Sequence, residues 1–280
     1  MGFEFQMLDG LQTIHTSFLD TFMISITKLG DAGIVWIILT VILLLIPKTR
    51  KAGGYMAVAL IADLIICNVI IKPIVARPRP YSINKTVQLL VTPLKDYSFP
   101  SGHTAASFAS VSALYFAGKK KVAAGALILS IFIGFSRLYL GVHYPKDVIV
   151  GAILGVLTAW ICYKLYIRIE NKMLLYLITF VLFLPALTFA HSADFIKGLG
   201  TYFGFLIGMF VEKKYVNFSV EGTRVNKIIR VLIGVLILLI LQTGLKVILP
   251  TGQIFAFIRY AVISFFGIGI YPIIFKKLKI

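Results

Sequence analysis

Apolar residues run along this chain in long blocks that short polar stretches interrupt. A helix that crosses a bilayer needs roughly 20 mostly apolar residues. The blocks that approach this length are residues 13–29, 32–47, 53–73, 101–118, 122–141, 145–166, 172–190, 195–212, 228–249 and 253–275. The first block is the weakest because it carries Asp20 and several hydroxyl groups, so it could lie partly in the interface. The pattern predicts an all-α, multi-pass transmembrane bundle.

The composition supports a membrane protein. Of the 280 residues, 59% are hydrophobic and 14% are charged, whereas soluble domains average about 45–50% apolar and about 25% charged residues. The net charge of +17 could indicate a nucleic-acid-binding protein. The basic residues lie in short runs between the apolar blocks, however, as they do in cytoplasmic loops of membrane proteins. We therefore expect contacts with membrane lipids and none with nucleic acid.

These basic runs predict the topology, because they follow every second apolar block. Their members are Lys48, Arg50, Lys51, Lys119, Lys120, Lys121, Lys164, Arg168, Lys172, Lys213, Lys214, Arg224, Lys227, Arg230, Lys276, Lys277 and Lys279. If all the blocks cross the bilayer, every run falls on one side, and that side is the cytoplasm. We therefore place both termini in the cytoplasm, in a multi-pass protein of the cell membrane.

Three polar stretches fall on the opposite face, where basic residues are disfavoured. They read K-P-I-V-A-R-P-R-P at 72–80, P-S-G-H at 100–103 and S-R-L-Y-L-G-V-H-Y-P-K-D at 136–147. Alternating topology brings the three stretches to one level, on the extracytoplasmic side. Two histidines and very little acid lie there, together with the cations Lys72, Arg77, Arg79 and Arg137. Cations held on the disfavoured side point to a functional site.

The cations and one helix start predict a phosphate-binding pocket. The guanidinium groups of Arg79 and Arg137 match phosphate oxygens in a bidentate way, and Lys72 adds a point charge. Ser101 can cap a helix whose free N–H groups and dipole face an anion. Gly102 lets that anion approach the backbone.

The histidines add chemistry to binding. His143 precedes Asp147 by four residues, and Pro145 suits the first turn of a helix between them. The Asp147 carboxylate can then hold one ring nitrogen of His143 and leave the other as a lone pair. A nucleophilic imidazole and His103 near the leaving oxygen suffice for two-step phosphoryl transfer, and the cations remove the need for a metal or cofactor.

The three stretches resemble the motifs of the type 2 phosphatidic acid phosphatase superfamily, which includes the lipid phosphate phosphatases. That family's pattern is K-x6-R-P, then P-S-G-H, then S-R-x5-H-x3-D. It is met here, in order and with full spacing, by Lys72, Arg79, Pro80, Pro100, Ser101, Gly102, His103, Ser136, Arg137, His143 and Asp147.

The resemblance implies a role for each matched residue. It makes His143 the nucleophile that forms a phosphohistidine, His103 the acid for the leaving alcohol, and Asp147 the residue that orients His143. The phosphate would lie among Lys72, Arg79, Ser101, Gly102 and Arg137. It also implies a six-helix phosphatase core, which would cover residues 1–170. Residues 171–280 would add about four transmembrane helices of unknown role.

The sequence thus predicts a lipid phosphatase acting on a phosphate monoester or diphosphate at the extracytoplasmic face. Phosphatidic acid, phosphatidylglycerol phosphate and undecaprenyl diphosphate all fit, because the motifs grip only the phosphate. A non-catalytic phospholipid binder or scramblase, a vanadate-dependent oxidase and a soluble phosphosugar phosphatase are the alternatives. A homo-oligomer is compatible with the extra helices.

Some polar residues lie outside the motifs. Arg77 either joins the pocket or faces lipid head groups only. Asp63 could support the site from below, and a structural hydrogen bond with Asn68 or with a neighbouring helix is the preferred interpretation. His191 has no partner set and is not expected to be catalytic. Cys67 and Cys162 fit neither a disulfide nor a metal-ligand spacing.

Overall fold

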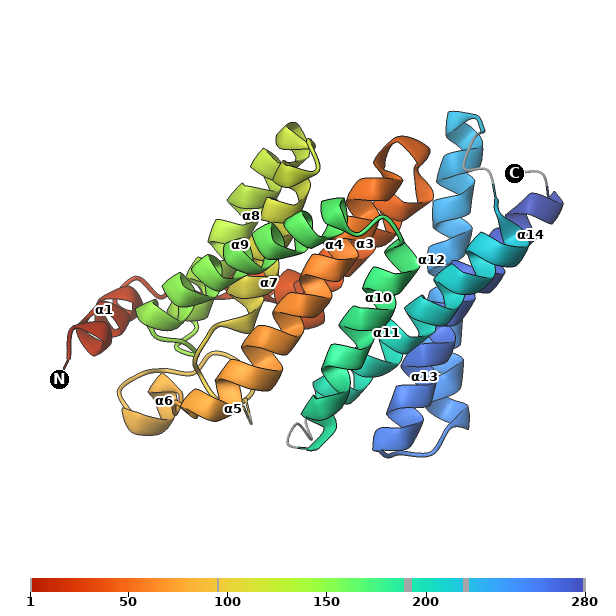
Figure 1. The fold of residues 1–280 in the computed structure, drawn as a ribbon. Helices are drawn as coiled ribbons and strands as arrows, with labels where there is room; N and C mark the ends of the chain where they lie inside the picture. The colour runs from red at the N-terminus through yellow and green to blue at the C-terminus, as the bar shows by residue number, and fades with distance from the viewer. Residues whose placement is uncertain (1, 95, 189–192, 219–221, 279–280) are drawn as a thin grey trace. The chain divides into compact units, whose positions relative to one another are not determined.

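The computed structural model describes residues 2–94, 96–188, 193–218 and 222–278, and His191 lies outside these ranges. The described residues are nearly all helical and contain no strand, which confirms the all-α prediction (Figure 1). The chain forms two compact units. Unit 1 comprises Met1–Val41 and Ala52–Leu165, and unit 2 comprises Ile42–Lys51 and Tyr166–Ile280. Unit 2 thus includes the residues just before α4, and the predicted boundary at residue 170 stays a prediction.

Unit 1 contains short helices at its start and three long ones after them. Their bounds are α1 Phe3–Gln12, α2 Ser17–Gly30, α3 Ile34–Leu45, α4 Arg50–Asp63, α5 Lys72–Val75, α6 Pro80–Ile83, α7 Gly102–Phe116, α8 Lys120–Tyr139 and α9 Pro145–Arg168. The π-helical turn Leu64–Ile71 joins α4 to α5 without a break. Thr16 caps the start of α2, because its hydroxyl accepts a hydrogen bond from the Leu19 N–H.

All ten predicted blocks are helical, but they differ in their fitness to cross a membrane. Six helical segments of the described chain are long and apolar enough: Arg50–Ile83, Lys120–Tyr139, Pro145–Arg168, Phe195–Val216, Val225–Ile248 and Gln253–Leu278. The first two predicted blocks form the pair Ser17–Gly30 and Val35–Leu44, which is bent by 45° and could count as one broken span. The fourth block, α7, has 15 residues, and Lys172–Thr188 is also short.

Two glycines bring α9 close to α7. A Cβ on Gly155 would clash with the carbonyl of Ala105, and one on Gly151 would lie 2.7 Å from the carbonyl oxygen of Ser101. Small residues at this spacing let helix backbones meet inside a membrane. The result is that the Ser101 N–H donates to the Asp147 carbonyl at 3.0 Å, so the starts of both helices lie side by side.

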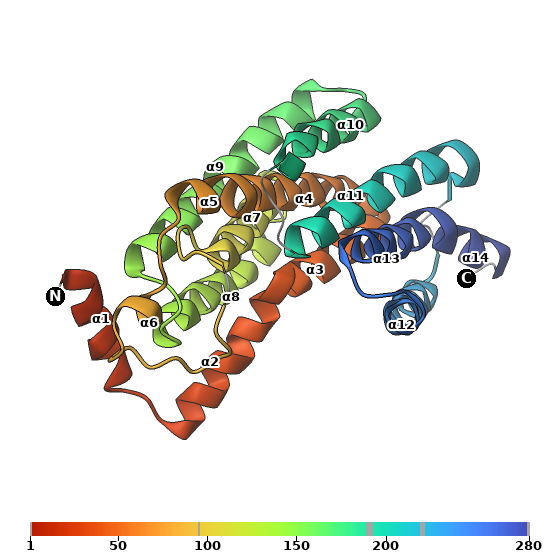
Figure 2. The same cartoon turned by 90° about the horizontal axis from the view of Figure 1, so that it is seen from below.

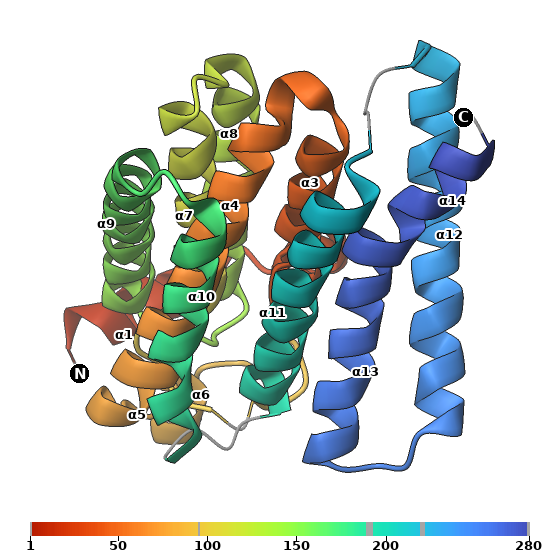
Figure 3. The same cartoon turned by 45° about the vertical axis from the view of Figure 1, so that its right-hand side comes forward.

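Unit 2 uses the same packing device. It contains α10 Lys172–Phe183, α11 Ala193–Val211, α12 Arg224–Ile248, α13 Gln253–Phe265 and α14 Tyr271–Leu278. A Cβ on Gly200 or Gly204 of α11 would clash with the α13 backbone at Phe257 or Ala261, and Figure 3 shows the two helices running side by side. Tyr271 and Phe275 of α14 form an apolar core with Val216 and Phe218.

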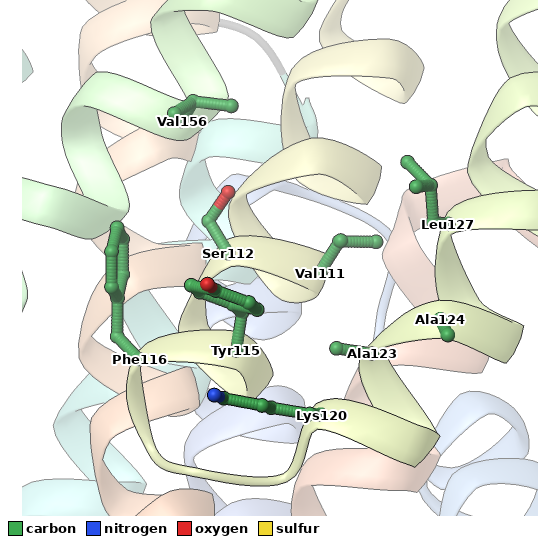
Figure 4. A pocket seen from close by; sticks show the side chains of 9 residues that line it. All are labelled: Val111, Ser112, Tyr115, Phe116, Lys120, Ala123, Ala124, Leu127 and Val156. Atoms are coloured by element: carbon green, nitrogen blue, oxygen red, sulfur yellow. The ribbon is translucent and has the colours of Figure 1, made fainter.

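One apolar cavity of about 460 Å³ lies among α7, α8 and α9 (Figure 4). Apolar side chains such as Val111, Phe116 and Leu127 line it, and Lys120 lies at its edge. Val111 and Phe116 lie near the end of α7 that is far from His103, and α7 is roughly 22 Å long at 1.5 Å per residue. The cavity is therefore separate from the predicted phosphate site.

Candidate active site

The three predicted stretches meet at one end of unit 1. Lys72 begins α5, Arg79 precedes α6, Ser101 precedes α7, Arg137 lies in the last turn of α8 and His143 lies in the turn before α9. The side chains are withdrawn from solvent in a region otherwise rich in apolar residues. Those that are buried are Lys72, Arg79, Ser101, Arg137, His143 and Asp147. Burying so many ionisable groups is costly unless they are paired, so their partners determine how the site works.

His143 and Asp147 lie together as the sequence predicts. The Asp147 Oδ2 lies 3.5 Å from the His143 Nδ1, which is longer than a strong hydrogen bond. The hydroxyl of buried Ser98 bridges the gap, because it donates to Asp147 Oδ2 and lies 3.5 Å from the same ring nitrogen. The Tyr144 N–H also donates to Asp147 Oδ2 at 2.9 Å. The carboxylate is thus fixed on the Nδ1 side of the ring.

The other ring nitrogen of His143 faces a cation. The Arg79 Nη1 lies 3.2 Å from His143 Nε2 and donates to the Val142 carbonyl at 2.8 Å. Burial lowers the pKa of His143 well below 6.5, and the charges of Arg79, Arg137 and Lys72 lower it further. A neutral imidazole with its Nε2 among cations is the form that a nucleophile needs.

Asp96 holds the two cations predicted to bind phosphate, although the sequence pattern predicts very little acid here. Its carboxylate accepts hydrogen bonds from Lys72 and from Arg79, the latter at 2.6 Å. Burial would raise the pKa of Asp96, but the charges and hydrogen bonds of Lys72 and Arg79 outweigh it and lower the pKa. Asp96 therefore stays ionised and offers these cations the oxygen atoms that a phosphate would offer.

The start of α7 differs in detail from the prediction. Ser101 occupies the N-cap position, but its hydroxyl pairs with the Thr104 hydroxyl at 2.9 Å and caps no backbone N–H. A Cβ on Gly102 would clash with the side chain of Asn68. Gly102 thus packs against the side chain of Asn68, and its close approach to an anion stays a prediction.

His103 and Arg137 reach the site through other partners. The His103 Nε2 lies 2.8 Å from Asp31 Oδ1, and Arg137 donates to the hydroxyl of Thr27. The Arg137 Nε is buried and has no hydrogen-bond partner among the described residues. The charge of Arg137 acts on both His103 and His143, so it belongs to the same electrostatic cluster.

Arg77 joins the site through Asp147, which decides between the two interpretations of this residue. Its Nη1 lies 2.8 Å from Asp147 Oδ1 and its Nη2 lies 2.6 Å from Glu4 Oε2. Its guanidinium also stacks over the ring of Tyr144, 3.7 Å from the ring centroid. Arg77 thus ties the carboxylate behind His143 to the N-terminal helix rather than facing lipid head groups only.

The same contacts place the N-terminal helix beside the site. Glu4 of α1 pairs with Arg77, and the ring of Phe5 packs edge-on against Tyr144 at 5.5 Å. Figure 2 shows α1 beside α6, at the site end of unit 1. The first helix and the site therefore lie at the same end of unit 1, whereas the sequence interpretation places them on opposite sides of the membrane. Between them, α2 and α3 form a pair bent by 45°, which counts as one broken span or as a re-entrant loop.

Asp63 does not pair with Asn68 as expected. It is fully buried in α4, and its Oδ1 accepts from the Cys67 thiol at 3.4 Å. Cys67 and Cys162 are both free and buried, in agreement with the sequence. The part of the chain that the structure describes contains no group of three or more His, Cys, Asp or Glu side chains placed to hold a metal.

Four residues of the site were missed at the sequence level: Glu4, Asp31, Ser98 and Asp96. Each acts as a partner of a motif residue and comes from outside the motif spacing. The sequence carries a hint for two of them. Asp31 separates two apolar blocks in K-L-G-D-A-G, and Ser98 lies two residues before the P-S-G-H stretch.

Family models match both parts of the chain. Residues 52–170 match the PAP2 superfamily, and residues 196–280 match the PAP2 superfamily phosphatase transmembrane extension. The first match contains every residue of the three motifs. The second match assigns residues 196–280, whose role the sequence leaves open, to a transmembrane extension found in phosphatases of this superfamily.

Curated relatives match more than half of the chain. An undecaprenyl-diphosphatase from Sulfolobus acidocaldarius is 30% identical over 61% of this chain and 80% of its own length. The undecaprenyl-diphosphatase BcrC from Bacillus subtilis is 32% identical over 59% of this chain and 83% of its own length. A lipid A 4'-phosphatase from Bacteroides thetaiotaomicron is 29% identical over 59% of this chain and 80% of its own length.

Two crystal structures share the fold. LpxE from Aquifex aeolicus superimposes with a TM-score of 0.52 at 28% identity and covers 59% of this chain and 96% of its own. A transmembrane PAP2-type phosphatidylglycerolphosphate phosphatase from Bacillus subtilis gives 0.50 at 26% identity and covers 59% and 85%. These matches confirm the resemblance drawn from the motifs: this chain belongs to the PAP2 superfamily and is a multi-span membrane phosphatase of that family.

Proposed function

We propose that this chain hydrolyses the diphosphate of a polyprenyl lipid, of the kind represented by undecaprenyl diphosphate, at the extracytoplasmic face. Two of the relatives described above are named for that activity, and the match to this chain spans about four-fifths of the length of each. The lipid A and phosphatidylglycerol phosphate phosphatases among the similar proteins make those lipids the competing substrates.

The first step of the proposed mechanism is attack by His143 Nε2 on the terminal phosphorus. A P–N bond forms while the bond from phosphorus to the leaving oxygen breaks, and His103 gives its proton to that oxygen. Lys72, Arg79 and Arg137 stabilise the charge on the equatorial oxygens. For this, the phosphate displaces the Asp96 carboxylate from Lys72 and Arg79.

The second step releases inorganic phosphate. His103 takes a proton from a water molecule whose oxygen attacks the phosphorus, and the P–N bond to His143 breaks. Asp147 holds the Nδ1 side of the ring through both steps, so the same nitrogen is used each time. Neither step draws on a metal or a cofactor.

The proposed orientation follows from charge. The lysine run at 119–121 lies at the far end of α7 from the site, and such runs favour the cytoplasm. The N-terminal helix at the site end carries Glu4 and Asp9 and no basic residue. We therefore infer that the site and the N-terminus are both extracytoplasmic.

The contact between Arg79 and the Nε2 of His143 carries this proposal, because it sets the nucleophilic atom among the phosphate-binding cations. The test measures phosphate release from purified undecaprenyl diphosphate, phosphatidylglycerol phosphate, phosphatidic acid and lipid A. The wild type is compared with His143→Ala and with His15→Ala, whose ring contacts the Tyr139 carbonyl outside the site.

We expect undecaprenyl diphosphate to give the highest kcat/KM, His143→Ala to abolish turnover and His15→Ala to retain it. Brief reaction with labelled substrate should leave acid-labile, alkali-stable phosphate on the wild type. Activity should survive EDTA, and vanadate should inhibit. A strict requirement for magnesium, or full activity in His143→Ala, would contradict the mechanism, and preference for another lipid would correct the substrate alone.

A further inference from the structure

The chain contains a second histidine–carboxylate pair, besides His143 and Asp147, at the break between α2 and α3. The Oδ1 of Asp31 lies 2.8 Å from the Nε2 of His103. The backbone comes close to the same ring just before this residue, because a Cβ on Gly30 would lie 3.0 Å from the ring carbon Cδ2. The turn after α2 thus packs against the imidazole and presents a carboxylate to it.

Electrostatics give this carboxylate a task. Burial opposes protonation of the His103 ring and so lowers its pKa, and the charges of Arg137 and Lys72 lower the pKa further. A general acid must carry a proton when the leaving oxygen needs it. Of the charged groups acting on this ring, Asp31 is the one that favours the protonated form.

We propose that Asp31 is a positioning residue that holds the Nε2–H of His103 and so assigns proton transfer to the Nδ1. This inference rests on the proposed function, because it concerns the acid of that reaction. The Nδ1 proton passes to the leaving oxygen as the P–O bond breaks, which leaves the Nε2–H tautomer on Asp31. The free Nδ1 then takes the proton from the attacking water in the second step.

Leaving groups of different basicity test this role. An alkoxide leaves phosphorus only with a proton, as diacylglycerol does from phosphatidic acid, whereas para-nitrophenolate leaves without one. For Asp31→Asn we expect kcat/KM on phosphatidic acid to fall by about 10- to 100-fold, and kcat/KM on para-nitrophenyl phosphate to change by less than about threefold.

The matched control is Asp20→Asn, because Asp20 lies in α2, the helix that ends just before Asp31. Its carboxylate accepts a hydrogen bond from the Tyr139 hydroxyl at 2.6 Å. Asp20→Asn should lower neither activity. Asp31→Glu restores a carboxylate and should recover part of the loss on phosphatidic acid. This variant carries the same comparison if Asp31→Asn does not fold, as judged from its thermal melting in detergent.

Equal losses on both substrates would reveal a structural role and overturn the inference. Unchanged or increased turnover of phosphatidic acid would also overturn it, because Asp31 would then only occupy the place of a substrate group. The proposed function fails separately, if the wild type releases no phosphate or if His143→Ala matches it.

Discussion

Unit 1 and unit 2 each bring a pair of helices into backbone contact through glycines, but they differ in what they bury beside that contact. In unit 1, Gly151 and Gly155 lie against α7, and a buried cluster of cations, imidazoles and carboxylates lies at the end of the pair. In unit 2, Gly200 and Gly204 lie against α13. The buried charged residues described there are Glu212 and Arg230, and Glu212 pairs with Arg50 at 2.8 Å.

This difference separates scaffold from chemistry. Close helix packing through small residues is a general way to build a membrane bundle, so it carries no information about function. Ionisable groups inside a membrane protein are costly and mark functional sites. Unit 1 carries the family's catalytic motifs, and unit 2 matches the transmembrane extension without a comparable cluster among its described residues.

The largest expected effect comes from removing one side chain from the charged cluster. His143→Ala should lower kcat by about 10³-fold or more, because it removes the proposed nucleophile. Glu212→Gln removes the buried charge of unit 2 and should keep kcat within about twofold while lowering the melting temperature. Phosphate release and thermal melting of both variants check this. A Glu212→Gln variant as inactive as His143→Ala would break the comparison.

A smaller effect should follow from separating the packed helices. Gly155→Leu forces α9 away from α7 and moves Asp147, so it should reduce kcat/KM by about 100-fold, as a misplacement near 1 Å can do. Gly204→Leu makes the corresponding change in unit 2 and should destabilise the protein by about 1–3 kcal/mol with little loss of kcat/KM. Denaturation in mixed micelles and steady-state kinetics measure both. Equal kinetic losses would mean that unit 2 also shapes the site.

A third prediction concerns anion binding at the cations of unit 1. Asp96→Asn removes the carboxylate that Lys72 and Arg79 hold, so vanadate should inhibit about tenfold more tightly, a gain of about 1.4 kcal/mol. Glu212→Gln should leave the inhibition constant unchanged. The inhibition constant is measured against a fixed lipid substrate. Weaker inhibition in Asp96→Asn would mean that Asp96 orients the cations instead of competing with the anion.

The smallest expected effect concerns the pH at which kcat/KM falls on the acid side. The pKa of His143 is lowered well below 6.5 by burial and by neighbouring cations, and the nucleophile must be unprotonated. As the pH falls through this lowered pKa, the imidazole gains a proton and activity is lost. The acid limb of kcat/KM should therefore lie well below pH 6.5, and Glu212→Gln should not move it. An acid limb at or above pH 6.5 would contradict the lowered pKa.

The sequence predicted the helices from its long apolar blocks, and it predicted the three motif stretches from the close spacing of their residues. Apolar blocks of about 20 residues mark helices whatever their partners, and His143 and Asp147 lie one helical turn apart. Asp31 and Asp96 could not be assigned in this way. Their partners lie 72 and 24 residues away along the chain, so only the folded chain brings them together.

The position of the N-terminal helix beside the site was not predicted, and the cause is physical as well. The sequence interpretation gives α2 and α3 one crossing each, but Asp31 and two nearby glycines interrupt the apolar run, and the pair is bent by 45° there. A bent pair that counts as one span puts the first helix on the same side as the site. The count of basic loops did not reveal this, because residues 1–12 contain no Lys or Arg.

The bond network from Glu4 through Arg77 to Asp147 has a practical consequence for work on this enzyme. A polypeptide fused before Met1 ends three residues from Glu4, the first member of that network. An affinity tag or fluorescent protein placed there would disturb the pairing that holds the carboxylate behind the nucleophile. Kinetic constants obtained with such fusions would describe the fusion as much as the enzyme.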